Sequence, residues 1–563
     1  MATVPGAEGS YAPPPSAANP ASAASDAARR WVAARDLTLP AAALLTLGAL
    51  AVYRTTLMPG LSFWDTGEVQ TVLPVLGTMH PTGFPALVVI GWLFSVIAKP
   101  LGEPAFLMNL MAAVCAALAA GGTVLVVRRL GVPLPVALAS GAGFALTPVT
   151  WHISSAAGEH ALHIVLVVAL TLALLRWQAL VDGRRQRPGD TAYRRRGDRA
   201  VILAAAIYGV AIANHALALI LAPSIVLFVL AVEPRVLLRP KLILAAVGTV
   251  VGVAALLYLE LPLRAGLLPA PLVYAHPDTW SGLLDVVLAR QFQGDVHGLL
   301  SGLPDKAGAL LDLATGQFGV LVALLPVGLL VAAVRKPKYA LFSGTAALVA
   351  VGFAGSYTNA DITRYYLGPV FFGWTWLALL AGALVDAITG RPWKATAAEL
   401  DEGAGTEQMF ALPGWRWVAV STAVAIAFGA ALLVPTASAL GDRWRVADQS
   451  SNTQAPAWLD QAFGAMAPGA VVVSWWSYST PMWYGEYVQG RRTDIKIVDD
   501  SNLVWDHLGS ASDVIGAYLG KRPVYVIRAS YSDIQTLAEQ YVIQPVGRPA
   551  NLFLVTGRLG TNP

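Results

Sequence analysis

Long apolar runs separated by short polar loops make up most of the chain between residues 38 and 435. A helix that crosses a membrane requires about 20 mostly apolar residues. The runs that reach or approach this length are 38–58, 105–127, 134–151, 160–180, 200–213, 216–232, 241–261, 318–334, 339–356, 366–388 and 415–435. The short runs 200–213 and 216–232 are expected to form a tilted hairpin around Asn214 and His215. The pattern predicts a polytopic α-helical membrane protein with about 11 transmembrane helices.

A twelfth apolar run, 82–98, has only 17 residues, and the basic loops decide how it is placed. Clusters of arginine and lysine occur at Arg29, Arg30 and Arg35, at Arg128 and Arg129, throughout 181–199, at Arg235, Arg239 and Lys241, at Arg335, Lys336 and Lys338, and at Arg391, Lys394 and Arg416. All of these clusters share one face of the membrane only if 82–98 does not cross it. Because lysine and arginine favour the cytoplasmic side, we predict that 82–98 is an interfacial helix within a first outer loop, 59–104.

The two ends of the chain differ from the apolar part, 37–440. Residues 1–36 are rich in Ala, Pro, Ser and Gly, which predicts a disordered cytoplasmic tail. Residues 441–563 follow the last span and alternate short β-rich runs with helix-like segments, which predicts a small α/β domain with a mostly parallel sheet on the outer face. The expected strands are 470–475, 494–499, 523–528 and 550–556, and the expected helices are 455–466, 479–489, 510–520 and 531–541. A second large outer loop is expected at 262–317.

Composition supports a membrane protein and excludes several other classes. Of the 563 residues, 56% are hydrophobic and 13% are charged, about half the charged fraction of soluble domains. The net charge of +4 is small, and the arginines lie in loops between spans, so nucleic acid is not an expected partner. A single cysteine, Cys115, excludes disulfides and thiolate metal sites. High Ala, Arg and Gly usage is typical of a GC-rich bacterial genome, which predicts the bacterial inner (plasma) membrane.

Two carboxylates, Asp65 and Glu68, follow the first span at a spacing of three residues, which places them on one face of a helix. One interpretation is a capping box, in which Asp65 caps the helix and Glu68 closes the box. The other is functional, because carboxylates at a membrane surface lose hydration unless they have a partner. The pair could also hold a divalent cation, although we favour chemistry without a metal.

Further polar residues lie at the same outer face, on several different loops. A helix bundle would bring these loop ends together over a common cavity. Each residue also has a plain explanation: an acidic residue suits a helix N-terminus, a lone histidine is usually structural, and an arginine near an interface often reaches toward lipid headgroups. The candidate binding residues are His80, Glu159, His160, Asn214, His215, Arg264, Asp361, Arg364 and Tyr365.

Together these residues suggest a reaction. A carboxylate can take the proton from an acceptor hydroxyl, and a guanidinium can stabilise a departing phosphate. Those two groups suffice to move a sugar from a polyprenyl phosphate to an alcohol. A lipid substrate would also explain why the site lies at a membrane surface.

Several short motifs resemble one family. They are WDTGEVQ at 64–70, HPTGFP at 80–85, GEHAL at 158–162, GVAIANHA at 209–216, YLELPLRA at 258–265, HPDTW with ARQF within 276–292, DITRYYLGP at 361–369 and the segment 471–499. Their order and spacing are similar to those of GT-C-type membrane glycosyltransferases, once known as a domain of unknown function, which include a eukaryotic protein O-mannosyltransferase of the endoplasmic reticulum. The resemblance runs from about residue 45 to the end of the last span, and more weakly beyond it.

The resemblance implies a GT-C fold with its catalytic aspartate at Asp65 and with Glu68 nearby. It also implies an amphipathic helix after the acidic pair, in agreement with the placement of 82–98. Arg264 and Arg364 carry over as phosphate ligands. The family's Glu-x-Tyr pattern is broken, since His160 and Ala161 follow Glu159.

Our hypothesis is an inverting transfer of a hexose, mannose first, from a polyprenyl-phosphate donor to a hydroxyl of a protein Ser/Thr or a glycan, with Asp65 as general base. The expected partners are this donor, the acceptor and membrane lipids; no particular cofactor is predicted, and a divalent metal is the less favoured option. One alternative is a transporter or flippase for lipid-linked sugars, which would place polar residues at mid-membrane depth. Another is a non-enzymatic envelope assembly factor that uses residues 441–563 for binding.

Overall fold

A computed structural model describes residues 37–186, 189–298, 303–359, 361–390 and 415–560, together with the helical backbone at their edges. The predicted tail 1–36 and the basic residues Arg391 and Lys394 lie outside this part of the chain. Within it, nine helices are long and apolar enough to cross a membrane, or ten if one bent pair counts as a span. The nine are Thr38–Thr56, Pro104–Arg129, Glu159–Gln186, Thr191–Asn214, Pro240–Leu267, Asp305–Arg335, Pro337–Ser356, Ile362–Thr389 and Val418–Ser438. The chain is a multi-pass integral membrane protein.

The count differs from about 11 in two places, and each has a local cause. The run 134–151 is broken into α6 (Leu134–Ala145) and α7 (Pro148–Ser155), which meet at 60°. Thr147 is extended because it precedes a proline, and this ends the first helix. The run 216–232 begins with a 3₁₀ stretch and continues as α10 (Ala222–Val232), so it is shorter than a full span.

The run 82–98 forms the 13-residue helix α4 (Pro85–Ile97). At 1.5 Å per residue it is about 20 Å long, shorter than the ~30 Å hydrocarbon core. Its first turn is buried, whereas Ile90, Trp92, Leu93, Val96 and Ile97 are exposed. A short apolar helix that is buried at its start and mostly exposed beyond it suits the predicted position in the outer interface.

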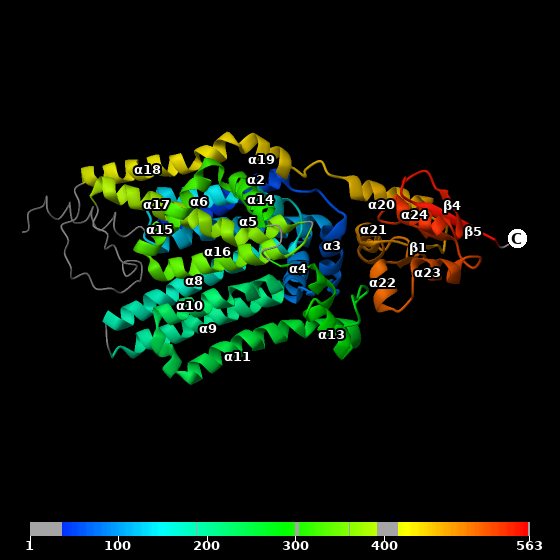
Figure 1. Ribbon diagram of the computed structural model, residues 1–563, viewed down its shortest axis with the longest axis horizontal. Helices are drawn as coiled ribbons and strands as arrows, with labels where there is room; N and C mark the ends of the chain where they lie inside the picture. Colours follow the sequence, from blue (N-terminus) through cyan, green and yellow to red (C-terminus); the bar gives the residue numbers. More distant parts are fainter. Residues whose placement is uncertain (1–36, 187–188, 299–302, 360, 391–414, 561–563) are drawn as a thin grey trace, which may run out of the picture.

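The bundle is built from helices that pack in series. The principal contacts join α2 (Thr38–Thr56) to α5 (Pro104–Arg129), α5 to α8 (Glu159–Gln186), α8 to α9 (Thr191–Asn214), and α9 to α11 (Pro240–Tyr258). A second group comprises α14 (Leu303–Phe318), α15 (Leu325–Arg335), α16 (Pro337–Ser356), α17 (Leu367–Thr389) and α18 (Trp415–Ser438). Figure 1 shows these helices side by side, with α3 (Trp64–Val75) and α4 at the end of the bundle that faces the C-terminal part of the chain.

The C-terminal part contains a five-stranded sheet in the order β2-β1-β3-β5-β4. Its strands are β1 (Val471–Val473), β2 (Lys496–Val498), β3 (Val524–Val526), β4 (Tyr541–Pro545) and β5 (Phe553–Arg558). The pairs of β1 with β2 and β3 are parallel, whereas β3–β5 and β4–β5 are antiparallel. The predicted mostly parallel sheet is therefore corrected to a mixed one. The unpredicted strand β4 closes a hairpin with β5, and a hairpin needs no crossover helix.

Helices cover both faces of this sheet. They are α20 (Gln454–Ala465), α21 (Trp476–Trp483), α22 (Asp500–Trp505), α23 (Ala511–Tyr518) and α24 (Tyr531–Ala538). The apolar cluster on one face, around Val472 and Tyr525, also includes Leu61 and Ala105 from the membrane part of the chain. The sheet therefore shares a core with the end of the bundle.

One buried side chain fixes the segment between the first span and α3. Asn109 of α5 is fully buried, and its Nδ2 donates to the carbonyls of Met58 and Gly60, at 3.0 Å each. Its Oδ1 accepts from Gln70 Nε2 at 2.8 Å and from the Ala157 amide at 2.9 Å. These bonds join the segment that follows α2, helix α3 and the approach to α8 at one point.

Replacing Asn109 by Leu should destabilise the protein by roughly 2–4 kcal/mol, because it strands several buried polar groups. The expected observation is a clear fall in the melting temperature followed by tryptophan fluorescence in detergent. Thr123→Val is a matched control, since Thr123 is buried on the same helix but bonds only to the Ala119 carbonyl of its own helix. Equal melting temperatures for the two variants would contradict this role of Asn109.

Candidate functional site

Helix α3 carries Asp65 and Glu68, the two acidic residues predicted from the sequence to be functional. Phe63 precedes the helix in an extended conformation and makes no side-chain cap. Asp65 is half-buried in the first turn, and its Oδ1 accepts a 2.8 Å hydrogen bond from Trp476 Nε1 of α21. Glu68 is buried and bonds elsewhere, to His80. The capping-box interpretation of the pair is therefore wrong.

The contact between α3 and α21 is close enough to require glycine. A Cβ at Gly67 would lie 2.6 Å from the Ser62 carbonyl oxygen and 2.7 Å from Thr480 Oγ1. Trp64 adopts a left-handed backbone with φ 58°, a strain of roughly 1–3 kcal/mol for a bulky residue. Its ring packs edge-on against Trp475, with centroids 4.9 Å apart. The C-terminal part of the chain therefore helps to position the backbone of α3 at Asp65.

Glu68 holds the loop that follows α3. The backbone N–H of His80 donates to Glu68 Oε1 at 2.8 Å, and the His80 ring forms an ion pair with Glu68 Oε2. The ring also packs against Phe84, Phe292 and Trp476, at centroid distances of 5.2, 6.3 and 5.6 Å. Burial alone would lower the pKa of His80, but the Glu68 carboxylate, with smaller help from other carboxylates, raises this pKa to about 9. Burial also raises the pKa of Glu68, so the charge of each member of this pair depends on the other.

A second cluster lies at the start of α8 and the end of α9. Glu159 and His160 form a buried ion pair, with Oε1 and Nδ1 2.5 Å apart. Asn214 Nδ2 donates to the Glu159 carbonyl at 3.2 Å, and the rings of His160 and His215 lie 5.0 Å apart. Arg364 Nη1 approaches Glu159 Oε1 to 3.9 Å. Residues from three predicted loops thus meet at one place.

Phe84 joins the two clusters. Its ring packs against His80 on one side, at 5.2 Å, and against His215 on the other, at 5.4 Å. Tyr365 completes the second cluster, with its ring 5.4 Å from His160 and 6.0 Å from His215. Asp361 is exposed and lies at the edge of this cluster. Its Oδ2 accepts a hydrogen bond from Arg364 Nη2 at 2.6 Å.

Arg264 contacts the C-terminal end of α3. It lies in a π-helical turn, Leu263–Leu267, that follows α11. Its Nε donates to the Leu76 carbonyl at 2.7 Å and its Nη2 to the Val75 carbonyl at 3.4 Å. A cation at the C-terminal end of a helix satisfies free carbonyls and the helix dipole. These contacts give Arg264 a structural role in holding α3.

Several buried polar atoms of the second cluster have no hydrogen-bond partner. They include Nε2 of His160, Nδ1 of His163, Oδ1 of Asn214 and Nε of Arg364. Native proteins seldom leave such atoms unpaired, and a bound ligand or water is a usual explanation. His163, which the sequence analysis did not select, belongs here: its ring lies 5.9 Å from that of His215. Its spacing of four residues from Glu159 was the signal available.

Within the part of the chain that is described, one group of side chains is arranged so that it could hold a metal ion. Ligand atoms of Glu159, His160 and His215 all lie within 4.8 Å of one another. However, His215 Nδ1 accepts the Leu217 amide at 3.0 Å. The neutral ring then carries its proton on Nε2 and offers a donor, whereas metal ligation needs a free lone pair. In this tautomer His215 is a poor metal ligand, which leaves Glu159 and His160 as the members of the group that could ligate an ion.

The fold is that of solved GT-C proteins. ArnT from Cupriavidus metallidurans, solved bound to undecaprenyl phosphate, matches with a TM-score of 0.57 at 14% identity, over 91% of this chain and 97% of that chain. The Archaeoglobus fulgidus oligosaccharyltransferase, solved tethered to an acceptor peptide, matches with a TM-score of 0.50 at 15% identity, over 92% of this chain and 74% of that chain. The chain is thus a polytopic membrane protein of the GT-C fold, with a small mixed-sheet domain at its C-terminal end.

The family resemblance predicted from the motifs is confirmed. Residues 65–237 match the family described as the Protein O-mannosyl-transferase TMEM260 N-terminal domain. The mouse Protein O-mannosyl-transferase TMEM260 is 23% identical over 482 residues, which make up 81% of this chain. The chain spans 62% of the length of that relative.

The raised pKa of His80 predicts a pH-dependent stability. The folded-state pKa of about 9 exceeds the ordinary 6.5, so the protonated ring contributes stability that is complete below about pH 6.5. This contribution is lost as the pH rises through about 9. We therefore expect the gap in melting temperature between wild type and His80→Gln to shrink steadily from pH 7 to pH 10.

Glu68→Gln serves as the companion variant, because its carboxylate is the main group that raises the His80 pKa. It should show the same flattened profile as His80→Gln. Parallel pH profiles for wild type and both variants would contradict the ion pair.

Proposed function

We propose that the protein transfers a hexose, mannose first, from a polyprenyl-phosphate donor to a hydroxyl of an acceptor at the outer membrane face. The observation that carries the proposal is the placement of Asp65. This carboxylate stands at the junction of the bundle and the C-terminal domain, held by the Trp476 indole. It lies within electrostatic range of both His80 and Arg364. A carboxylate with basic side chains in its surroundings suits a reaction between a hydroxyl and a sugar phosphate.

In the proposed reaction, Asp65 accepts the proton of the acceptor hydroxyl. The hydroxyl oxygen attacks the anomeric carbon of the sugar, and the bond from that carbon to the phosphate oxygen breaks on the opposite side. The electron pair leaves with the polyprenyl phosphate, and the anomeric configuration inverts. A phosphate is a good leaving group once its charge is met, so no separate general acid is required.

The second cluster is the proposed phosphate site. Arg364 has a buried Nε without a partner, and a guanidinium presents several donors in a planar fork. His215 offers Nε2–H, and His160 adds Nε2, which has no hydrogen-bond partner. Glu159 and Tyr365 then act by positioning these rings. Asp361 positions Arg364 from the outer side through their 2.6 Å hydrogen bond.

The acceptor would be a protein Ser/Thr or a glycan. The relatives' names support this class: one is called a protein O-mannosyl-transferase, and another was solved with an acceptor peptide. The C-terminal domain shares its core with the bundle beside Asp65, so it is placed to form part of the acceptor site. We propose transfer without a metal, in the bacterial inner (plasma) membrane, with the N-terminus cytoplasmic and the C-terminal domain outside.

The placement of buried ionisable groups speaks against a transporter. Among the described residues, the buried charged and histidine side chains lie in loops or within about one turn of a helix end. They are Glu68, Glu159, His160, His163, His215, Glu233, Glu260, Arg443 and Asp499. A transport path would place such groups at mid-membrane depth.

Asp65→Asn should lower sugar transfer by about 100-fold or more, because it removes the base while keeping the size of the side chain. The assay is release of polyprenyl phosphate from radiolabelled polyprenyl-phosphate mannose by the purified protein. Asp442→Asn is the matched control, since this exposed residue pairs only with Arg445 on the surface helix α19 (Leu440–Ala447). Full activity of Asp65→Asn would refute the assignment of the base.

Arg364→Gln should raise the KM for the donor by about tenfold or more, through loss of a charge-assisted contact with phosphate. Arg445→Gln, which removes an exposed arginine from the outer surface, should leave the KM unchanged. The measurement is initial rate against donor concentration for both variants. An unaltered KM in Arg364→Gln would remove Arg364 from the phosphate site.

A further inference from the structure

His80 is the one accessible residue of a turn that is otherwise buried. From Gly77 to Val88 every other residue is buried, whereas 15% of the His80 side chain is exposed. The turn is also tightly packed: a Cβ at Gly83, whose φ is 81°, would lie 3.0 Å from Leu261 Cδ1 and 3.1 Å from Val286 Cγ1. A polar side chain that stays accessible in such a turn is placed to meet a partner outside the protein core.

Glu68 fixes the orientation of the His80 ring. Its carboxylate accepts the backbone N–H of His80 at 2.8 Å and pairs with Nδ1 of the ring. The rings of Phe84, Phe292 and Trp476 pack edge-on around the imidazole. Within the described part of the chain, Nε2 of His80 makes no hydrogen bond. The arrangement therefore presents one polar atom, Nε2, in a fixed position.

The His80 ring borders the space between the proposed base and the proposed phosphate site. Burial lowers the pKa of His80 and Glu68 raises it. Asp65 and Glu159 raise it further, so both of these carboxylates lie within electrostatic range of the ring. Phe84 packs against His80 and also against the second cluster. In the proposed reaction the transferred sugar lies between Asp65 and the phosphate, so it passes beside His80.

A sugar hydroxyl suits Nε2 of His80 better than a phosphate oxygen does. Because Nδ1 faces the Glu68 carboxylate, Nε2 accepts a hydrogen bond when the ring is neutral and donates one when the ring is protonated. A hydroxyl can donate or accept, so it bonds to Nε2 in either state. A phosphate oxygen without a proton only accepts, so it bonds to Nε2 in the second state alone.

We infer that Nε2 of His80 hydrogen-bonds a hydroxyl of the transferred hexose, with Glu68 as the positioning residue that fixes the imidazole. The inference rests on the proposed transferase function and deepens it, because it names a residue that selects the sugar. A site built to hydrogen-bond a substrate hydroxyl rejects the analogue that lacks this hydroxyl, because the protein group is then left unpaired.

The test uses polyprenyl-phosphate donors that carry the hexose transferred by wild type, each lacking a different sugar hydroxyl. Wild type should lose about tenfold or more in kcat/KM with one of these deoxy donors. His80→Phe should use that donor and the intact donor with similar kcat/KM, because the variant has no polar group left to miss the hydroxyl. The losses with the other deoxy donors should be the same in both proteins.

A second variant covers the case in which His80→Phe does not fold because it strands the buried Glu68 carboxylate. In Glu68→Gln/His80→Phe the new side-chain amide is uncharged, and its oxygen still accepts the backbone N–H at position 80. This double variant should show the same selective loss of discrimination as His80→Phe.

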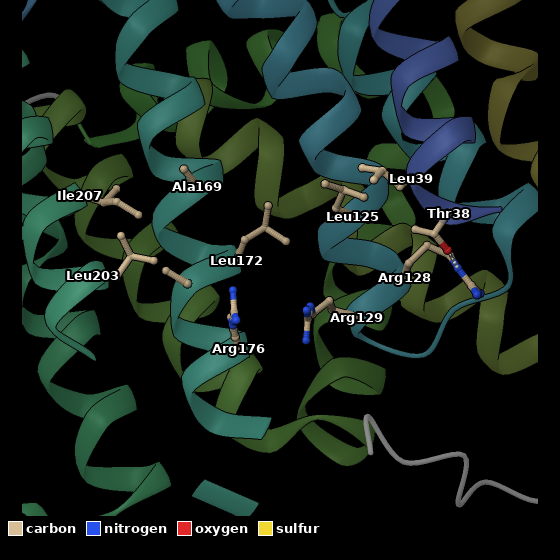
Figure 2. Close-up of a pocket in the computed structure, with 11 residues that line it drawn as sticks. Thr38, Leu39, Leu125, Arg128, Arg129, Ala169, Leu172, Arg176, Leu203 and Ile207 are labelled. Atoms are coloured by element: carbon tan, nitrogen blue, oxygen red, sulfur yellow. Dashed lines mark hydrogen bonds between the residues drawn. The ribbon is translucent and has the colours of Figure 1, made fainter. Parts of the chain in front are cut away.

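Two controls separate the contact with sugar from general effects. His276→Gln removes a histidine that pairs with Asp506 at the protein surface, and it should keep every loss seen in wild type. Figure 2 shows Leu172 on the wall of a hollow of about 410 Å³ between α2, α5, α8 and α9. Leu172 follows Glu159 by 13 residues along α8, or about 20 Å. Leu172→Ala should lower the melting temperature without changing the pattern of losses.

Unchanged losses for every deoxy donor in both His80 variants would overturn the inference, as would a wild type that loses nothing with any of them. Binding of the same radiolabelled donors, measured by scintillation proximity, separates this result from failure of the proposed function. If wild type binds the donors but transfers no sugar, the transferase proposal is wrong. The same comparison of wild type with the His80 variants, made in Kd, then supports or overturns the contact itself.

Discussion

The structure of the face that carries the candidate site depends on one buried amide. In a membrane bundle, helix packing alone does not place the irregular segments between spans, because their backbone groups need partners away from water. Asn109, which is buried near the start of α5, supplies those partners. It bonds to the carbonyls of Met58 and Gly60, to Gln70 and to the amide of Ala157. The segment that follows α2 and the approach to α8 are thereby bonded to the same turn of α5. These bonds fix the position of α3, which carries one half of the candidate site, relative to the start of α8, which carries the other half.

From this point, α3 is held along its whole length. Its start packs on α21, where Gly67 permits a backbone approach that any side chain would block. Its end is capped by Arg264. In between, Glu68 is occupied by His80, which leaves Asp65 as the carboxylate of the pair that faces the junction. The arrangement separates the two acidic residues by role: one fixes the loop, and the other is available for chemistry.

Much of the fold could be predicted from the sequence, because a chain in lipid must satisfy its backbone within helices and apolar length then marks each span. The break at Thr147 and the short helix α10 were not predicted, because an apolar run does not reveal where a helix bends. Strand β4 escaped because Tyr541–Pro545 directly follows a helical pattern. For the site, the grouping of its residues at one end of the bundle followed from topology. The capping box was wrong because spacing alone cannot tell which groups a carboxylate meets: Asp65 bonds to Trp476, 411 residues away.

The most direct test follows the bond between the sugar and the phosphate, which breaks in the proposed reaction. The purified full-length protein would be incubated with a panel of radiolabelled polyprenyl-phosphate hexoses and a hydroxyl acceptor, with the anomeric configuration of the product determined by NMR. The account predicts that polyprenyl phosphate is released in step with glycosylated acceptor and that the product has the inverted configuration. Labelled lipid that binds but never loses its sugar would contradict transfer, and a product with retained configuration would contradict direct displacement assisted by Asp65.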